Sequence, residues 1–313
     1  SRVSRGLGDV YKRQVKDNNI GHEKQVKNLL DEISKKIDLH IDERLVKGFF
    51  PFFTYLENVE EKKYDLIIGA GHKTYSLILN TKKNQKSDTK SVAILSPTFN
   101  KNKFDLICAP MHDRDKFKKT DNVIFFEGSI AKVSDSETDE NTILIAVGGK
   151  NKHYYFDEDY IIAQINYFIS VHPNKNCYIY NSRRTPPSTN KKLKSLQDIY
   201  NNIKFFDFNH GSSDFETTLK NASSKLITRD SVNMVFESLS CKGKTYLMDM
   251  KKIRSSNKVV KVIDSLIENK KIGFIDCSNI TDGMSKMKLQ KQNIHNEIYA
   301  EVEKISYKLL QLI

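Results

Sequence analysis

The sequence predicts a two-domain α/β protein built on parallel β-sheets. Short apolar runs alternate with helical patterns along nearly the whole chain of 313 residues, and this alternation is typical of βα units. The polar run 134–141 (SDSETDEN) has the composition of a linker, and the alternating pattern restarts after it. Two consecutive βα-rich halves of ordinary domain size indicate two Rossmann-like domains.

Residues 1–14 stand apart because Asp9–Gln14 (DVYKRQ) resembles the translation of a transposon end used in building sequencing libraries. We therefore expect residues 1–14 to be foreign to the natural protein, with the natural N-terminus and the first β-strand missing. Without them, 47 basic and 38 acidic residues leave a net charge of +9 in place of +12.

The first half is predicted to begin with one helix, which four strands follow with helical or irregular segments between them. The helix covers Glu23–Ile37, where apolar residues recur at helical spacing. The strands are predicted at Tyr64–Gly69, Val92–Leu95, Asp105–Ala109 and Val123–Phe126.

In the second half the alternation of strands and helices restarts. Its strands are predicted at Ile143–Val147, Cys177–Tyr180, Ile203–Phe208, Lys225–Thr228 and Thr245–Met248. Its helices are predicted at Asp157–Val171, Ser188–Tyr200, Ser231–Cys241 and Val259–Glu268. The stretch from Met284 to Ile313 is predicted to form one long amphipathic helix.

These elements predict an N-terminal domain over residues 15–138, a C-terminal domain over 139–283 and a C-terminal helix over 284–313. In open α/β sheets, ligands bind outside the carboxyl ends of the strands. We therefore expect the working site in a cleft between the two domains.

Composition narrows the class of protein. The basic residues are dispersed, without an aromatic and basic ribbon or an RNA-binding signature, so nucleic acid is not expected as a partner. The four cysteines form no CxxC pair, which predicts reduced thiols and no metal site. We also expect no cofactor. No apolar stretch approaches the ~20 residues that span a bilayer. We expect a cytoplasmic protein, and the positive charge leaves peripheral contact with an anionic inner membrane open.

In the first half, polar segments that follow predicted strands supply candidate residues. A histidine titrates near neutral pH and suits general base catalysis, and His22 opens the first helix in a position to do this. A lone histidine often has a structural role, and glycines at strand ends often serve turn geometry alone, so both interpretations stay open. The other candidates on this side are Gly69, Gly71, His72, Lys73, Thr74, His112 and Asp113.

In the second half, three strand ends carry candidate anion-binding residues. A glycine pair precedes basic residues at 148–154, two arginines precede a helix at 182–186, and the turn at 228–231 leads into another helix. A guanidinium fork beside a helix N-terminus suits a diphosphate. Roles without a ligand also explain parts of this pattern. These are a hinge at the glycine pair, helix capping at 182–186, and a capped helix with an exposed face after the turn at 228–231. The candidates are Gly148, Gly149, Lys152, His153, Tyr154, Ser182, Arg183, Arg184, Thr185, Asp230, Ser231, Asn233, Met234 and Glu237.

Six segments together resemble the mitochondrial fission ELM1 family, whose bacterial members are treated as glycosyltransferases. They occur in family order: GHEKQ at 21–25, DLIIGAGHKT at 65–74, PMHD at 110–113, GGKNKHY at 148–154, SRRTP at 182–186 and DSVNMVFES at 230–238.

This resemblance implies a fold of the glycosyltransferase-B (GT-B) type, with the acceptor on the N-terminal domain and a nucleotide sugar on the C-terminal domain. By analogy with such enzymes, Glu237 would bind the ribose, and Arg183 and Arg184 would bind the diphosphate. Fold analogy alone places His22 where many such enzymes keep a base.

The leading hypothesis is a metal-independent, inverting glycosyl transfer from a nucleotide sugar to a cell-envelope glycan or lipid, with His22 as the base. The alternative is a non-catalytic recruitment factor at a membrane surface, which the basic charge and the amphipathic C-terminal helix fit equally. A third hypothesis is a nucleotide-sugar epimerase that uses His72, His112 or His153. The sugar, the nucleotide base, the acceptor and the oligomeric state stay open.

Overall fold

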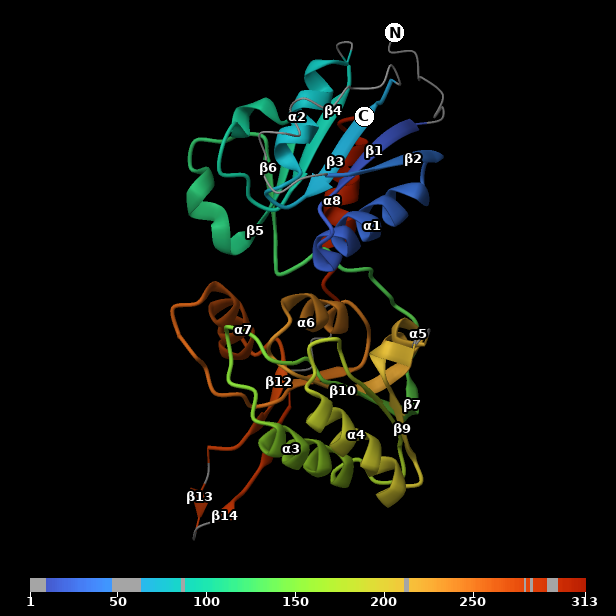
Figure 1. Ribbon diagram of the computed structural model, residues 1–313, viewed down its shortest axis with the longest axis vertical. Helices are drawn as coiled ribbons and strands as arrows, with labels where there is room; N and C mark the ends of the chain where they lie inside the picture. Colours follow the sequence, from blue (N-terminus) through green and yellow to red (C-terminus); the bar gives the residue numbers. More distant parts are fainter. Residues whose placement is uncertain are drawn as a thin grey trace. The chain divides into compact units, whose positions relative to one another are not determined.

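The chain is an α/β protein with two compact units, each with its own parallel sheet (Figure 1). The computed structural model describes residues 10–46, 63–85, 88–210, 214–278, 280–281, 284–291 and 298–313. The N-terminal unit comprises Ser1–Lys132 and Ala300–Ile313, and the C-terminal unit comprises Val133–Tyr299. The predicted fold class is confirmed.

The N-terminal unit has a sheet of parallel strands in the order β2-β1-β3-β4-β5-β6. The strands are β1 Val10–Lys16, β2 Leu39–Leu45, β3 Leu66–Ala70, β4 Lys90–Ile94, β5 Leu106–Pro110 and β6 Val123–Phe126. The chain runs outward from β1 to β2 on one side and from β3 to β6 on the other. The switch point, where the strand order reverses, therefore lies between β1 and β3.

Helices cover both faces of this sheet, with α2 (Tyr75–Lys83) on one face and α1 (Ile20–Ser34) and α8 (Glu301–Leu310) on the other (Figure 1). Two 3₁₀ helices, η2 (Lys101–Lys103) and η3 (Met111–Phe117), flank β5. The helices α1 and α8 pack against each other.

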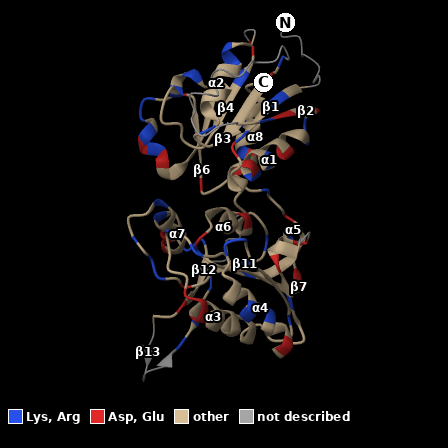
Figure 2. Cartoon of the chain, viewed as in Figure 1, with Lys and Arg blue, Asp and Glu red and all other residues tan. Residues whose placement is uncertain are grey.

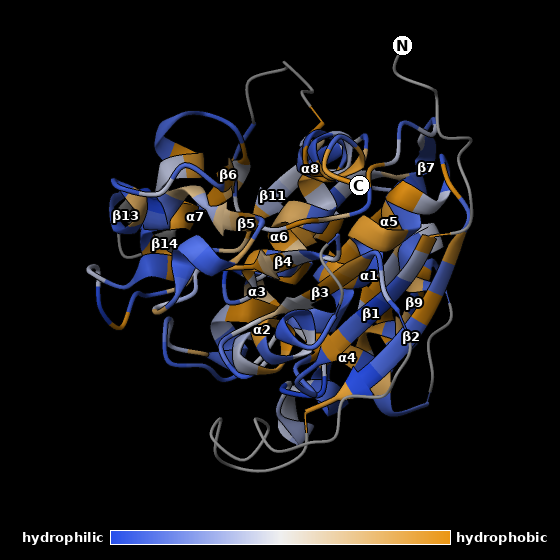
Figure 3. Ribbon diagram, turned by 90° about the horizontal axis from the view of Figure 1, so that it is seen from above, coloured by the Kyte–Doolittle hydropathy of each residue, from blue (hydrophilic) through white to orange (hydrophobic). Residues whose placement is uncertain are grey.

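The C-terminal helix α8 has the predicted apolar stripe, because Val302, Ile305 and Leu309 are completely buried. Apolar and polar residues accordingly alternate around α8 in Figure 3. This stripe packs within the N-terminal unit and so is not free to meet a membrane.

The prediction of one long helix from Met284 is wrong for its first part. Met284–Ser285 (β14) pairs with Ile280–Thr281 (β13), and Lys288–Gln290 (β15) pairs antiparallel with Gly273–Asp276 (β12). The edge of β12 presents backbone N–H and C=O groups that need partners. The strand β15 supplies them, and this pairing outweighs the local helical pattern.

The C-terminal unit has its sheet in the order β15-β12-β11-β10-β7-β8-β9, parallel except for β15. The remaining strands are β7 Asp139–Ala146, β8 Asn176–Tyr180, β9 Ile203–Phe206, β10 Ala222–Ile227 and β11 Lys244–Leu247. The order reverses between β7 and β10, which makes this pair the switch point.

Alternate residues of β7 build the two halves of the core in this unit. Ile143 and Ile145 belong to a cluster with residues of α3 and α4, whereas Leu144 and Ala146 belong to a cluster with residues of α5, α6 and α7. This follows from the two-residue period of a strand that is covered on both faces. The helices are α3 Glu158–Ser170, α4 Pro187–Ile199, α5 Phe215–Asn221, α6 Val232–Leu239 and α7 Lys258–Glu268, and a 3₁₀ helix, η4, spans Phe208–His210.

Charge is dispersed in both units, with Lys and Arg interspersed among Asp and Glu (Figure 2). Within the part of the chain that the structure describes, no helix is both long and apolar enough to cross a membrane.

A strand does precede the first helix, and Val10–Lys16, mostly from the segment expected to be foreign, forms it as β1 between β2 and β3. That the natural first strand is missing stays a prediction. Its composition is unusual, since central parallel strands are normally apolar. Lys12 is completely buried, and its Nζ has no hydrogen-bond partner among the described residues. Burial lowers the pKa of Lys12 from 10.5 to about 7. Such a strand fits a segment that is foreign to the natural protein, which stays a prediction.

We expect Lys12→Met to raise the free energy of unfolding by ~1–3 kcal/mol at neutral or lower pH, because it removes an unpartnered buried amine. The folded-state pKa lies below the unfolded one, so the gain should be largest below pH 7 and should shrink as pH rises from 7 to 10.5. Urea unfolding at several pH values measures this, with Lys16→Met as control because Lys16 pairs with Glu43 at the surface. A gain that does not depend on pH would contradict the explanation.

Candidate functional site

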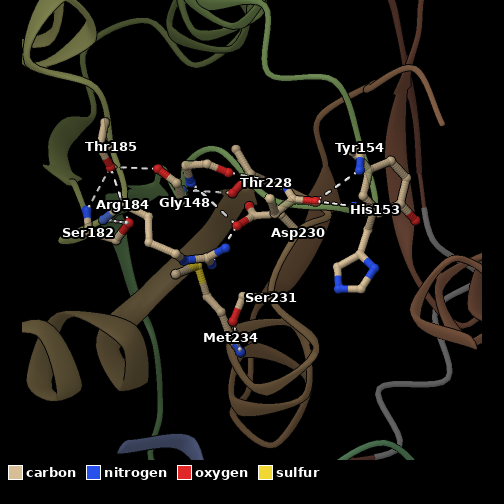
Figure 4. Close-up of polar contacts among 12 residues, drawn as sticks. Gly148, His153, Tyr154, Ser182, Arg184, Thr185, Thr228, Asp230, Ser231 and Met234 are labelled. Atoms are coloured by element: carbon tan, nitrogen blue, oxygen red, sulfur yellow. Dashed lines mark hydrogen bonds and ion pairs between the residues drawn. The ribbon is translucent and has the colours of Figure 1, made fainter. Parts of the chain in front are cut away.

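Three neighbouring strands of the C-terminal sheet, β10, β7 and β8, end in loops that hydrogen-bond to one another (Figure 4). The N–H of Gly148, after β7, donates to Oγ1 of Thr228, after β10, at 2.8 Å. Oγ1 of Thr185, after β8, donates to the carbonyl of Gly148 at 2.5 Å. One glycine therefore ties together the loops of all three strands.

Both glycines of the pair are required by close packing. An added Cβ at Gly148 would lie 2.1 Å from Oδ1 of Asp230, and one at Gly149 would lie 1.9 Å from the carbonyl oxygen of Arg184. The N–H of Gly149 donates to Oδ2 of Asp230 at 3.3 Å. These glycines thus allow Asp230 and Arg184 to pack against the β7 loop. A phosphate contact at the same glycines stays a prediction.

Asp230 and Arg184 form an ion pair at this switch point. Nη2 of Arg184 lies 2.6 Å from Oδ2 of Asp230, whose side chain has no exposed surface, whereas the Arg184 side chain is 39% exposed. The neighbouring Arg183 is exposed. The pair places a partly exposed guanidinium at the end of β8, beside the turn that opens α6.

The helix α6 begins directly after Asp230. Ser231 is its N-cap, and its side chain accepts a hydrogen bond from the N–H of Met234. Asn233 and Glu237 are both partly buried, and their spacing puts them on one face of this helix, as predicted. At the C-terminal end of α6, the buried Nζ of Lys225 donates to the carbonyls of Ser238, Cys241 and Lys242.

The loop after Gly149 is held by Asn151, whose Oδ1 accepts from the N–H groups of His153 and Tyr154 at 2.6 and 2.9 Å. The side chain of Lys152 is exposed. Tyr154 is buried, and its backbone forms an isolated antiparallel β-bridge with Lys252. Burial lowers the pKa of His153 below its ordinary value, and a hydrogen bond with the side chain of Asn257 opposes this shift.

A second polar cluster lies at the switch point of the N-terminal sheet. Nδ1 of His22, in the first turn of α1, lies 2.8 Å from Oδ2 of Asp17, which follows β1. The Asp17 side chain is 6% exposed and that of His22 is 26% exposed. Gly71, after β3, has a positive φ of 89°, and an added Cβ there would lie 2.3 Å from Nδ1 of His22. The structure therefore brings His22, Asp17 and Gly71 together.

Gly69 and Thr74 support this turn. A Cβ on Gly69 would lie 2.8 Å from the carbonyl oxygen of Val15, and Oγ1 of Thr74 donates to the carbonyl of Gly71. His72 and Lys73 are exposed, and the His72 ring packs edge-on against Phe99.

His112 and Asp113 lie in η3, at the end of β5. His112 is exposed, whereas Asp113 is buried and pairs with Lys116 at 2.8 Å. The strand β4 separates β5 from β3 in the sheet.

Sequence reasoning missed Asp17, Asn151 and Thr228. Asp17 lies next to the segment set aside as foreign, although its spacing of five residues from His22 across a capped turn was available as a signal. Thr228 ends a predicted strand and begins the turn at 228–231, but it is not among the candidate residues. Its hydrogen bond to Gly148 spans 80 positions and leaves no local signal.

An Asp–His pair of this kind can orient the imidazole and leave Nε2 to take a proton. An arginine beside a helix N-terminus can hold a phosphate. Within the described ranges, no group of three or more His, Cys, Asp or Glu is arranged to hold a metal ion.

Solved structures with a similar fold are enzymes of the GT-B type. The UDP-GlcNAc 2-epimerase from Methanocaldococcus jannaschii has a TM-score of 0.54 and 14% identity, covering 97% of this chain and 100% of that one. The E. coli ADP-heptose LPS heptosyltransferase II has a TM-score of 0.50 and 10% identity, covering 96% and 99%. The S. aureus MnaA–UDP complex has a TM-score of 0.50 and 12% identity, covering 84% and 89%.

At these identities the likeness shows the GT-B fold alone. No curated protein matches the sequence. The family model described as mitochondrial fission ELM1 matches residues 18–302, which include both polar clusters except Asp17. The chain therefore belongs to the mitochondrial fission ELM1 family.

Proposed function

We propose that the protein is a metal-independent glycosyltransferase that uses a nucleotide sugar as donor and a cell-envelope glycan or lipid as acceptor. The observation that carries this proposal is the pair of polar clusters, one at the switch point of each sheet. A base in one unit and an anion site in the other are what glycosyl transfer to a hydroxyl requires.

The C-terminal cluster supports donor binding. The partly exposed guanidinium of Arg184 and the first N–H groups of α6 are suited to the diphosphate, whose developing charge they would stabilise without a metal ion. Glu237, on the same helix, would accept hydrogen bonds from the ribose hydroxyls. The S. aureus MnaA structure holds UDP on a similar fold, which is consistent with a nucleotide ligand.

The N-terminal cluster supports proton transfer. In this proposal Asp17 holds Nδ1 of His22, so that Nε2 removes the proton from the acceptor hydroxyl as its oxygen attacks the anomeric carbon. The glycosyl–phosphate bond breaks at the same time, and the nucleoside diphosphate leaves with the bonding electrons. Protein residues would supply all of these roles, and we propose no cofactor.

The recruitment hypothesis loses one of its two supports. It relied on the basic charge and on the amphipathic C-terminal helix, and the apolar stripe of that helix is buried within the N-terminal unit. The nucleotide-sugar epimerase named above shares only the fold with this chain, at 14% identity. A glycosyltransferase and an epimerase differ in product, which the assays below separate.

Donor binding is tested by thermal shift with nucleoside diphosphates and their sugar conjugates. A bound ligand at 100 times its Kd should stabilise the protein by about 2.7 kcal/mol. Glu237→Ala should weaken the binding of that ligand about tenfold or more, because it removes hydrogen bonds to a charged group. Glu303→Ala, on the exposed side of α8, is the control. Unchanged affinity in Glu237→Ala would contradict the role assigned to Glu237. If no compound of the panel stabilised the protein, the recruitment hypothesis would be favoured.

The role of His22 is tested with the donor that this panel identifies. His22→Ala should lower kcat by about 10²–10⁴-fold with donor affinity unchanged, and Asp17→Asn should give a smaller loss in kcat. Release of nucleoside diphosphate is measured with an envelope lipid extract as acceptor and with water alone, and His40→Ala on β2 is the control. Full activity in His22→Ala would refute a base at this position. Conversion of the donor to its epimer, without diphosphate release, would support the epimerase.

A further inference from the structure

A cavity of about 330 Å³ lies within the C-terminal unit, at the carboxyl ends of the neighbouring parallel strands β10, β11 and β12. Arg229, Asp249 and Cys277 line it just after these three strands, and Asp264 and Glu268 line it from α7. Ligands of open α/β sheets bind at such strand ends, in pockets of roughly 300–1,000 Å³. The cavity therefore has the place and the size of a small-ligand site.

Arg229 supplies a nearly buried cation to this cavity, because the residue is only 6% exposed. Its Nε donates to the carbonyl of Met248 at 2.7 Å, and its Nη2 lies 3.3 Å from Oδ1 of Asp249. A guanidinium has five N–H donors, so these contacts leave Nη1 without a partner in the described part of the chain. A buried charge needs hydrogen bonds, and acceptor atoms of a ligand in the cavity would provide them.

Asp249 faces the same cavity and is fixed by two contacts. Its Oδ2 accepts a hydrogen bond from the hydroxyl of Tyr160 at 2.7 Å, and its Oδ1 lies beside Arg229. The side chain is 35% exposed. Each carboxylate oxygen has two lone pairs, so Asp249 can accept further hydrogen bonds from a ligand while the protein holds it in place.

The charges on the cavity wall limit which ligands fit. The wall carries two cations and four carboxylates, which are Arg229, Lys252, Asp249, Asp264, Glu268 and Asp276. Arg229 pairs with Asp249, and Nζ of Lys252 lies 2.7 Å from a carboxylate oxygen of α7. Four negative and two positive charges leave a formal charge of −2. A second anion in the cavity would be repelled, because charges that are partly withdrawn from water are screened less.

Hydroxyl groups match this wall better than charged groups do. A hydroxyl both donates and accepts, so the hydroxyls of a sugar can donate to the carboxylates and accept from Arg229. Phe274 and Ile275 add apolar surface for the C–H groups of a ring. Among the residues that the structure describes, these carboxylates are not grouped to hold a metal ion. An uncharged, polyhydroxylated ring is the ligand that satisfies the whole wall.

We propose that this cavity binds an uncharged sugar ring and excludes acidic sugars such as uronic acids. The inference rests on the proposed function and deepens it, because it names the class of sugar. Arg229 directly precedes Asp230, whose partner Arg184 would hold the diphosphate, so the cavity adjoins the proposed donor site. The glycosyl group of the donor and a sugar of the acceptor share this chemistry, and the experiment separates the two.

Cys277 provides a local measurement of ligand binding, because it lines the cavity and is partly exposed, whereas the other three cysteines are buried. Its alkylation is followed by mass spectrometry at mildly alkaline pH, since burial raises the pKa of its thiol. Methyl β-glucoside should slow the alkylation of Cys277. Methyl β-glucuronide should need a concentration about tenfold higher for the same effect, because its carboxylate meets the excess negative charge.

The same order is expected for UDP-glucose over UDP-glucuronic acid and for GDP-mannose over GDP-mannuronic acid. The double variant Glu268→Gln, Asp276→Asn removes the excess charge and keeps groups that accept hydrogen bonds. It should bring each acidic sugar within about threefold of its neutral counterpart. Asp198→Asn, at an exposed position of α4 outside the cavity, is the control and should keep the tenfold preference.

Protection of Cys277 by the nucleotide sugars, and not by UDP or GDP, would assign the ring to the donor. Protection by methyl β-glucoside, with nucleotide sugars that bind but do not protect, would assign it to the acceptor. Equal protection by neutral and acidic sugars would overturn the inference, and so would a lack of protection by every sugar. If no nucleotide compound shifts the melting temperature, the proposed donor site fails, and the two methyl glycosides still decide whether the cavity takes a neutral sugar.

Discussion

The ion pair between Arg184 and the fully buried Asp230 is the contact on which the arrangement of the C-terminal site depends. A carboxylate without exposed surface is several kcal/mol unstable unless a cation and hydrogen bonds compensate it. Arg184 comes from the loop after β8 and Gly149 from the loop after β7, so compensating Asp230 requires both loops to close on the turn before α6. The same closure leaves Gly148 and Gly149 no room for a Cβ. Sheet order makes it possible, because β10, β7 and β8 are neighbours.

The N-terminal unit also has a polar pair at its switch point, built from different residues. Its polar pair, Asp17 and His22, also lies at the point where the strand order reverses, and Gly71 from the neighbouring strand end packs against the imidazole. At such a point two adjacent loops diverge to opposite faces of the sheet and leave space for a ligand. A residue with a side chain at Gly71 would clash with the His22 imidazole. In both units the strand order therefore determines where the polar pair lies, and a glycine leaves room for its side chains.

The sequence predicted the buried strands well because parallel strands covered on both faces are continuous apolar runs, as in β3, β5 and β7. It could not predict β1, whose Lys12 and Arg13 are polar where the sheet is apolar, or β15, which depends on the edge of β12. In the site, the arginines and the α6 turn were identified from local signals. The pairing of Arg184 with Asp230 spans 46 positions and is set by strand order, which no local pattern encodes.

In the proposed donor site, the ion pair would hold the Arg184 side chain in one orientation and leave most of its N–H groups available to a ligand. A guanidinium has five N–H donors, and Asp230 takes only one of them, through Nη2. The side chain remains 39% exposed, so other donors can reach a phosphate. Without Asp230, an arginine at the end of β8 would sample many rotamers and lose that freedom on binding. In the proposed donor site the buried carboxylate would remove this cost before the ligand binds, and Arg184 would already compensate its negative charge when a diphosphate approaches. A buried aspartate can therefore belong to an anion-binding site, provided that its negative charge stays paired with the arginine.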